Sequence, residues 1–157
     1  MADTHKGGGY PPIGFNFSVS ASANGSNTSS DAWFQRVSGI GARRSYTEVV
    51  EGGLNNTVYH LPAGIRYDNL ILERGLVPKN SDLGAWYAKS LMTQTGPIQT
   101  RVVIVTLFDY DSKTPTLSWS FYNAYPVRWM LSDFRSDQSV LAIETIELAY
   151  SHFESMK

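Results

Sequence analysis

Hydrophobic and polar residues alternate over residues 13–20, near the start of the chain. One set of alternating positions is apolar: Ile13, Phe15, Phe17 and Val19. The other set is small or polar: Gly14, Asn16, Ser18 and Ser20. A period of two places each set on one face of an extended strand. The pattern therefore predicts a half-buried β-strand, and the Ser-, Asn- and Gly-rich residues 21–30 predict a loop after it.

The same kind of pattern predicts further short strands up to residue 74. The candidate segments are residues 33–40, 43–50, 57–61 and 69–74. Glycine and asparagine residues at 51–56 predict a loop between the second and third of these strands. Pro62, Ala63 and Gly64 predict a turn between the third and the fourth.

One segment has the period of an amphipathic helix. Its apolar residues fall at i, i+3, i+4 and i+8: Leu83, Trp86, Tyr87 and Leu91. Asn80 or Ser81 can cap the first turn, and Asp82 is favourable there because a helix N-terminus attracts negative charge. We expect a short helix at residues 82–93, ending before Gly96-Pro97.

Strands resume after this helix. Residues 100–108 are apolar at both odd and even positions, which predicts a strand covered on both faces. Further strands are predicted at residues 117–122, 126–134 and 140–150. Many short strands and one helix indicate a mostly β fold, either a barrel or a sandwich, with one short outer helix. We expect residues 1–12 to form a flexible N-terminal arm and residues 13–157 to form a single β domain.

Composition adds to this picture, because the chain is rich in aromatic residues and poor in charged ones. Aromatic residues make up 13% of the 157 residues and charged residues 17%, against about 25% charged in an ordinary soluble domain. Tyrosine and tryptophan are favoured at protein interfaces. Four of these residues need more cover than one helix gives: Tyr122, Tyr125, Trp129 and Tyr150. They either complete the core of one chain or lie against a neighbouring chain.

Charge and reactive residues exclude several function classes. The net charge is −1, which gives no electrostatic footprint for sequence-specific nucleic-acid binding. The chain has no cysteine, and His5, His60 and His152 lack the spacing of metal ligands. Glu144 and Glu147 are three residues apart on a predicted strand, so they face opposite ways and do not form an acid/base pair. We predict no enzyme activity, no cofactor and no metal.

The chain also lacks apolar segments that would direct it to a membrane. No apolar run approaches the roughly 18 residues that a spanning helix needs. Residues 1–10 have no apolar core of the kind a secretory leader carries. We therefore expect the protein to be made, and at first kept, in a cytoplasm.

Residues 48–57 form an acidic, glycine-containing segment soon after two arginines. Glu48 and Glu51 lie beside the pair Gly52-Gly53, and Arg43-Arg44 precede them. One interpretation is an ordinary solvated loop. The other is a contact arm whose glycines let it conform to a neighbouring molecule.

Seven short motifs follow one another between residues 10 and 149. They are YPPIGFNF at 10–17, FQRVSGI at 34–40, VEGG at 50–53, HLP at 60–62, LILERGLV at 70–77, NAYPV at 123–127 and IETIELA at 143–149. In this order the set resembles the T-even-type phage tail tube family. The resemblance is greatest to inner-tube proteins of phage-like contractile injection systems.

This resemblance implies a tail-tube-type β-barrel whose strands complete a larger barrel between subunits. Six copies would form a ring, and stacked rings would form an inner tube whose lumen conducts effectors or DNA. Its implied partners are the sheath protein, the baseplate hub and spike, and a cap or tape-measure protein. The residues implied at assembly interfaces are Tyr10, Arg43, Arg44, Glu48, Glu51, Gly52, Gly53, Asn55, Asn56, Tyr125 and Trp129.

Two other functions stay open at this point. The chain departs from the family pattern in its long Ser/Asn-rich residues 21–30 and in Arg43-Arg44, where relatives often carry acidic residues. The first alternative is a tube-initiating paralogue that joins the tube to the baseplate hub. The second is a monomeric β-barrel that binds a small apolar ligand. The particle would be either a phage or an injection device, released from the cell or anchored to a membrane by other components.

Overall fold

Strands dominate the computed structural model, which describes residues 16–23, 32–53, 56–76, 82–92, 96–108, 115–132 and 142–156. The predicted flexible arm at residues 1–12 lies outside this part of the chain. The described strands and helix, in chain order, are β1 (Asn16–Ser22), β2 (Ala32–Phe34), β3 (Arg36–Ser38), β4 (Ala42–Val50), β5 (Val58–Tyr67), β6 (Leu70–Gly75), α1 (Asp82–Met92), β7 (Arg101–Phe108), β8 (Pro115–Leu131), β9 (Ile143–Ala149) and β10 (His152–Met156). The prediction of a mostly β fold with one short helix is confirmed.

Eight of these strands form the body of the molecule. Their order is β2-β1-β7-β8-β9-β6-β3, with β10 also paired to β8, and every pairing is antiparallel. The sheet curls until its two end strands, β2 and β3, are separated by Gln35 alone. The backbone N–H of Gln35 donates to the carbonyl oxygen of Glu73 on β6 (2.9 Å). The prediction of a single strand at 33–40 is therefore wrong. The segment divides at Gln35 into β2, which pairs with β1, and β3, which pairs with β6.

The longest strand, β8, also corrects two predictions. It continues through residues 123–125 and so joins the two strands that were predicted separately at 117–122 and 126–134. Asn123 has a positive φ of 53°, so the strand changes direction there without ending. Its first part pairs with β7 and β10, and its last part pairs with β9. Strand β10, which the sequence pattern did not separate from the strand predicted at 140–150, follows a break at Tyr150-Ser151.

Apolar side chains from these strands fill the interior of the body. The buried strand residues are Val19, Ala21, Phe34, Leu70, Leu72, Val103, Val105, Leu107, Phe121, Ala124, Ile146 and Leu148. Burying one large apolar side chain contributes about 1.5–3 kcal/mol. The outward residues of β7, such as Val102 and Ile104, are only half-buried. One chain thus fully covers one face of β7, and the prediction of cover on both faces is wrong for a single copy.

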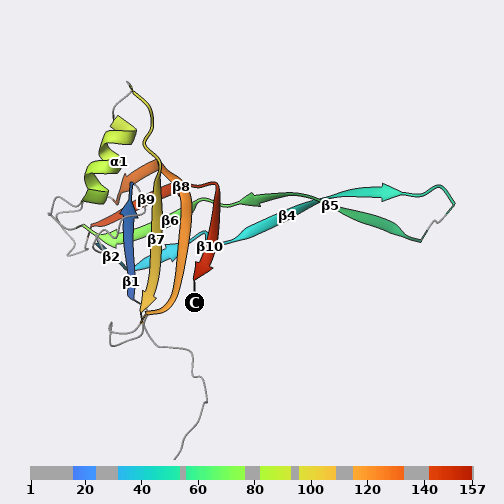
Figure 1. Ribbon diagram of the computed structural model, residues 1–157, viewed down its shortest axis with the longest axis horizontal. Coiled ribbons are helices and arrows are strands. Elements are labelled where there is room, and N and C mark those ends of the chain that lie inside the picture. Colours follow the sequence, from blue (N-terminus) through green and yellow to red (C-terminus); the bar gives the residue numbers. More distant parts are fainter. Residues whose placement is uncertain are drawn as a thin grey trace, which may run out of the picture.

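Helix α1 packs beside the body, where it contacts β8 (Figure 1). Its bounds agree with the predicted 82–93 to one residue. Leu83, Trp86 and Tyr87 are buried, and the Tyr87 ring stacks on Trp129 with centroids 5.8 Å apart. Asp82 in the first turn pairs with Arg101 (2.8 Å). The helix is therefore held by both ring stacking and charge.

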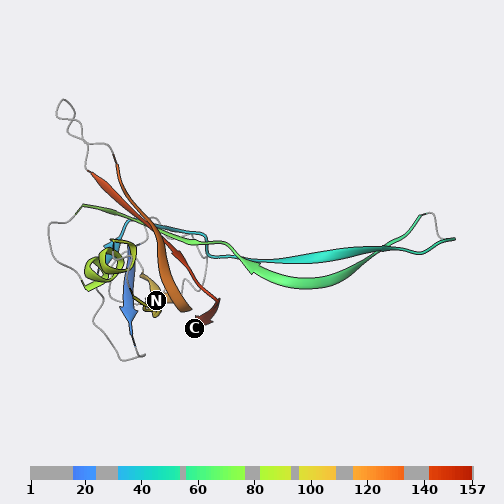
Figure 2. The same ribbon diagram turned by 90° about the horizontal axis from the view of Figure 1, so that it is seen from above.

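The remaining two strands, β4 and β5, form a long hairpin that extends away from the body (Figures 1 and 2). The predicted turn at residues 62–64 is wrong, because β5 continues through them. The register shifts between Arg44 and Tyr46, where Ser45 alone stands opposite Ala63 and Gly64. The Ser45 hydroxyl donates to the Gly64 carbonyl oxygen (2.9 Å). A β-bulge at this point accommodates the one extra residue of β5, so the strand continues without a turn.

Candidate assembly surface on the β4–β5 arm

The β4–β5 hairpin, called the arm below, exposes nearly all of its side chains. Every residue of β4 is exposed, and on β5 only Ala63 and Tyr67 are half-buried. The exposed large apolar residues on the arm are Tyr46, Val49, Val50, Val58, Tyr59, Leu61 and Ile65. A two-stranded hairpin alone in water is marginally stable at best, and its outer edges carry unpaired backbone groups. The arm therefore has the properties of a surface that another molecule covers.

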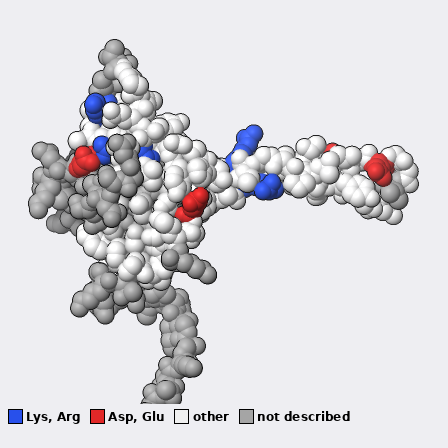
Figure 3. Space-filling view, in the orientation of Figure 1, with Lys and Arg blue, Asp and Glu red and all other residues white. Residues whose placement is uncertain are grey.

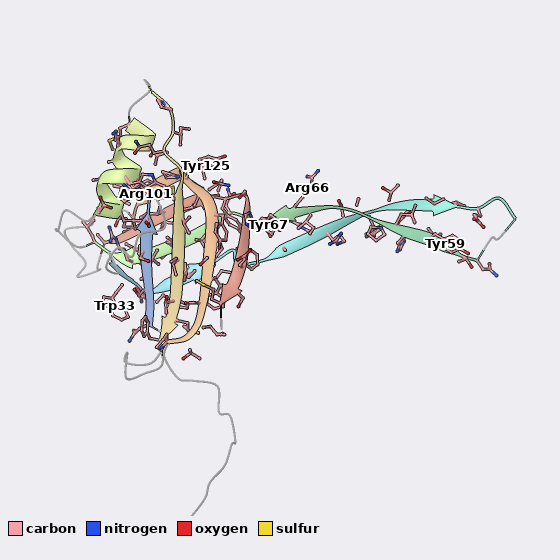
Figure 4. All side chains as sticks on the ribbon, in the orientation of Figure 1. Trp33, Tyr59, Arg66, Tyr67, Arg101 and Tyr125 are labelled. Carbon is pink, nitrogen blue, oxygen red and sulfur yellow. The ribbon has the colours of Figure 1, made fainter. Side chains whose placement is uncertain are left out.

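One face of the outer arm is apolar and carries no charge. Directly opposite residues lie on the same face of an antiparallel pair. Thr47 stands opposite Leu61, and Val49 stands opposite Tyr59. Tyr59 is labelled on the far part of the arm in Figure 4. These four side chains form a small apolar face, defined here as Thr47, Val49, Tyr59 and Leu61.

The other face of the outer arm combines aromatic and charged groups. The rings of Tyr46 and His60 lie 4.4 Å apart, and the His60 Nε2 atom lies 3.6 Å from a Glu48 carboxylate oxygen. All three residues are exposed. Because exposed ion pairs contribute little to stability, these contacts arrange the surface more than they stabilise the fold.

The base of the arm is fixed to the body by aromatic packing. Tyr67, labelled at this junction in Figure 4, lies 5.8 Å by ring centroid from both Tyr150 and Phe153. Nearby, Gly39 has a φ of +85°, and a Cβ there would lie 1.9 Å from the Asn69 carbonyl oxygen. Only glycine fits this conformation and this approach. The arm thus leaves the body in a defined direction.

The predicted interface residues fall into three groups. Arg43, Arg44 and Glu48 lie on β4, Glu51, Gly52 and Gly53 follow it at the tip, and Asn56 precedes β5. Tyr10 and Asn55 lie outside the described residues. The last two, Tyr125 and Trp129, lie on β8 in the body. The acidic, glycine-containing segment thus lies at the tip of a long arm. The exposed apolar residues on the rest of this arm were not among the predicted interface residues.

Trp129 and Tyr150 find part of their cover within the chain. The Trp129 indole N–H donates to Glu144 (2.9 Å), and its ring stacks on Tyr87. Tyr150 packs against Phe121, with ring centroids 4.9 Å apart. Both residues stay half-buried, so one chain covers them in part. An interface role for Trp129 rests on the resemblance and on this remaining exposed surface.

Glu144 is the centre of a buried polar cluster in the body. Arg74 Nε, the Tyr87 hydroxyl and the Trp129 indole all donate to its carboxylate. Burial alone would raise the pKa of Glu144, but these hydrogen bonds outweigh it and hold the pKa below the usual value of a glutamate. Burial, together with the hydrogen bond to Glu144, raises the pKa of Tyr87 to about 12. Through these three hydrogen bonds to one carboxylate, the cluster joins α1, β6, β8 and β9.

Other sites for chemistry are scarce in the part of the chain that the structure describes. Glu144 is buried, whereas Glu147 on the opposite face of β9 is half-buried and accepts a hydrogen bond from Asn69 (2.7 Å). The described residues include no cluster of three His, Cys, Asp or Glu suited to a metal. A cleft of about 280 Å³ beside α1 is lined by Trp86, Lys89, Ser90, Gly96, Pro97, Ile98 and Gln99. It contains one titratable side chain, Lys89.

A family profile matches most of the chain. The profile is described as T4-like virus tail tube protein gp19 and matches residues 13–154. The chain belongs to this family. The family prediction from the seven motifs is therefore confirmed. Tail tube proteins are structural subunits.

Solved structures similar to this tail tube protein come from contractile injection particles. One is the six-fold symmetrised baseplate of the anti-feeding prophage, with 26% identity and a TM-score of 0.78 over 94% of this chain and 97% of that one. Another is the sheath–tube complex of an extracellular contractile injection system, PVC, in its extended state, with 19% identity and a TM-score of 0.73 over 94% and 92%. A third is the cap that terminates the anti-feeding prophage tube, with 19% identity and a TM-score of 0.74 over 99% of each chain. No curated protein sequence matches the chain.

Proposed function

We propose that this tail tube protein is the inner-tube subunit of a contractile tail or injection system. Copies assemble as hexameric rings, the rings stack, and their lumen conducts effectors or DNA. The sheath protein, the baseplate hub and spike, and a cap or tape-measure protein are its other partners. The likeness to chains of a baseplate, a sheath–tube complex and a tube cap supports this set of partners.

The observation that carries the proposal is the exposed apolar arm. It projects from the body with two unpaired strand edges and a face of Thr47, Val49, Tyr59 and Leu61 that no part of the described chain covers. Apolar patches of this kind mark interaction sites, and strand edges pair readily with other chains. Adjacent subunits and rings of the same protein would provide both kinds of cover.

The assembly route follows from the same proposal. The subunit is made in a bacterial cytoplasm and assembles there onto a baseplate. The completed particle is then released or is anchored to a membrane by other components. Within the described chain, no helix is both long and apolar enough to cross a membrane.

Electron microscopy tests the proposed function directly. Negative-stain images of the purified protein at high concentration, and of intact particles that contain it, should show six-fold rings or hollow tubes. Purified protein that stays monomeric is compatible with a need for a baseplate template. Particles that contain the protein but no tube contradict the proposal.

A tube-initiating role is the second candidate, and one comparison favours it. The identity to the baseplate chain is 26%, against 19% for the sheath–tube and cap chains. An initiator forms one ring between the hub and the repeated tube. Counting copies per particle by quantitative mass spectrometry separates the roles: six copies indicate an initiator, and a number that grows with tube length indicates the repeated subunit.

A barrel that binds a small ligand has less support. The interior positions of β1, β6, β7 and β8 are filled by side chains with almost no exposed surface, such as Val19, Leu72, Val105 and Phe121. The cleft beside α1 is smaller than most sites for such ligands, which occupy about 300–1,000 Å³. A melting temperature that rises with an added apolar ligand, in a protein that stays a 17.4 kDa monomer, would favour this alternative.

A further inference from the structure

Charged residues on the arm are separated into a basic base and an acidic tip. The basic cluster, called the arginine base, consists of Arg43, Arg44 and Arg66, where β4 and β5 leave the body. The acidic cluster, called the acidic tip, consists of Glu48 and Glu51. Figure 3 shows blue side chains on both sides of the arm near the body and a red patch at its far end. One arm thus carries opposite charges at its two ends.

The arginine base is poorly neutralised within one chain. Arg43 stands directly opposite Arg66, a like-charge pair that is unfavourable in an antiparallel ladder. Arg43 forms an ion pair with Asp68 (2.8 Å), and both side chains are largely exposed. Arg44 and Arg66 form no ion pair with any described residue. Two positive charges therefore remain available to a partner.

The acidic tip is available in the same way. Glu48 has only the imidazole of His60, at 3.6 Å, and Glu51 forms no ion pair with a described residue. At about 3.3 Å per residue of extended strand, about 13 Å separates Glu48 from Arg44 and about 23 Å separates Glu51 from Arg44. Charges that far apart are screened from each other in physiological salt, where the Debye length is about 8 Å. The two clusters of one chain therefore cannot neutralise each other.

We propose that the acidic tip of one copy binds the arginine base of the next copy. This inference rests on the proposed function, because it needs copies arranged in a ring or a stack. A contact between two different patches of the same chain is heterologous, and such contacts repeat to give closed rings or continuing filaments. The apolar face of the arm packs alongside, and the charges set the register and exclude wrong pairings.

A polyanion such as nucleic acid is the competing occupant of the arginine base. The acidic tip on the same arm argues against it, since two carboxylates would repel a polyanion that followed the arm. A second copy of the chain satisfies both clusters at once. The whole chain has a net charge of only −1, so like-charge repulsion does not oppose close packing of many copies.

Charge reversal with rescue tests the contact. The acidic-tip variant carries Glu48→Lys and Glu51→Lys, and the arginine-base variant carries Arg44→Glu and Arg66→Glu. Each alone should yield at least tenfold less sedimentable ring or tube than the wild type, while circular dichroism stays β-rich. An equal mixture of the two variants should regain assembly, because each tip then meets a base of opposite charge. Lys89→Glu, an exposed charge reversal on α1, is the control and should assemble normally.

Disulfide trapping provides a second measurement, since the chain has no cysteine of its own. Glu51→Cys combined with Arg66→Cys should give a ladder of cross-linked multimers on oxidation of assembled protein. A disulfide needs Cα atoms within about 7 Å, so these two positions cannot join within one arm. Glu51→Cys combined with Lys89→Cys is the control and should give no ladder.

The outcomes separate this contact from the proposed function. Wild-type tubes with normal assembly of either charge variant, or with no rescue in the mixture and no ladder, overturn the contact and leave the tube function standing. An arginine-base variant that assembles normally but loses co-purifying nucleic acid overturns it in favour of a polyanion. Particles in which the wild-type protein forms no tube contradict both proposals.

Discussion

The body and the arm are made of similar β-strands, yet they treat their apolar residues in opposite ways. In the body, Leu72 has no exposed surface, whereas Leu61 on the arm is 54% exposed. Glu144 in the body is buried among three donors, whereas Glu48 on the arm has one imidazole neighbour and is exposed. The core of the body satisfies its groups within one chain, although apolar residues such as Trp33 (54% exposed) remain on the outside of the body. The arm leaves its groups for another chain.

This difference separates stability from assembly. A substitution in the body removes a contact that the single chain already makes, so it lowers the free energy of unfolding. A substitution on the arm removes a contact made only between copies. It should leave the unfolding of one chain nearly unchanged and alter assembly instead. Matched pairs of variants, one in each region, test whether stability and assembly depend on different residues.

The two glutamates should give the largest contrast. Glu144→Ala leaves the buried Arg74 guanidinium without its carboxylate, and breaking a buried ion pair costs about 3–5 kcal/mol. Glu48→Ala removes an exposed group and should change stability by less than about 0.5 kcal/mol. Urea denaturation followed by circular dichroism measures both. Equal losses for the two variants would contradict the comparison.

The two leucines provide the apolar version of this test. Leu72→Ala should destabilise the chain by about 2–5 kcal/mol, because it leaves a cavity in the core. Leu61→Ser should change the unfolding free energy little and should reduce the yield of sedimentable tubes. Denaturation and sedimentation are run on the same preparations. Normal tube yield from Leu61→Ser would show that this apolar face is not an assembly contact.

The junction between the two regions should show an intermediate effect. Gly39→Ala forces a side chain into a positive φ and against the Asn69 carbonyl oxygen, which should cost about 1–3 kcal/mol or more. Gly41→Ala is the control, because a Cβ there meets nothing within 4 Å. Thermal melting of the two variants side by side measures the difference. A Gly39→Ala protein as stable as Gly41→Ala would contradict the positive φ of Gly39 and its close approach to the Asn69 carbonyl oxygen.

A pH dependence is expected at Tyr87 in the body, and it is confined to strongly alkaline solution. Its pKa is raised from 10.0 to about 12 in the folded chain. The stability that this shift contributes is complete below pH 10 and is lost as the pH rises toward 12. Tyr87→Phe cannot titrate, so the stability difference between wild type and Tyr87→Phe should shrink across this window. A difference that stays constant from pH 9 to pH 12 would contradict the raised pKa of Tyr87, which burial and the hydrogen bond to Glu144 cause.

Local pattern predicted the fold class and the helix because both depend on spacing along the chain. The apolar period at Leu83, Trp86 and Tyr87 is local, and the helix appears within one residue of its predicted end. The prediction of a turn at residues 62–64 was wrong because it relied on local composition alone. Proline and glycine usually mark a turn, but here they lie in a continuing strand beside a bulge opposite Ser45.

The arm and the buried cluster depend on partners distant in the sequence. Arg74, Tyr87 and Glu144 come from three separate elements, so no local pattern brings them together. The arm residues Val49, Tyr59 and Leu61 look like ordinary strand residues in sequence. Only the register of β4 with β5, and the absence of a covering layer in the described chain, reveals them as a surface.

A reconstruction of the assembled particle by electron cryomicroscopy would show whether neighbouring copies cover the β4–β5 arm. The measurement is the exposed surface of the β4–β5 arm in the tube, at a resolution that traces each chain. We expect the apolar face of Thr47, Val49, Tyr59 and Leu61 to be covered by a neighbouring copy, and the acidic tip to lie beside that copy's arginine base. An arm that projects into solvent, in contact with no other copy, would contradict the account.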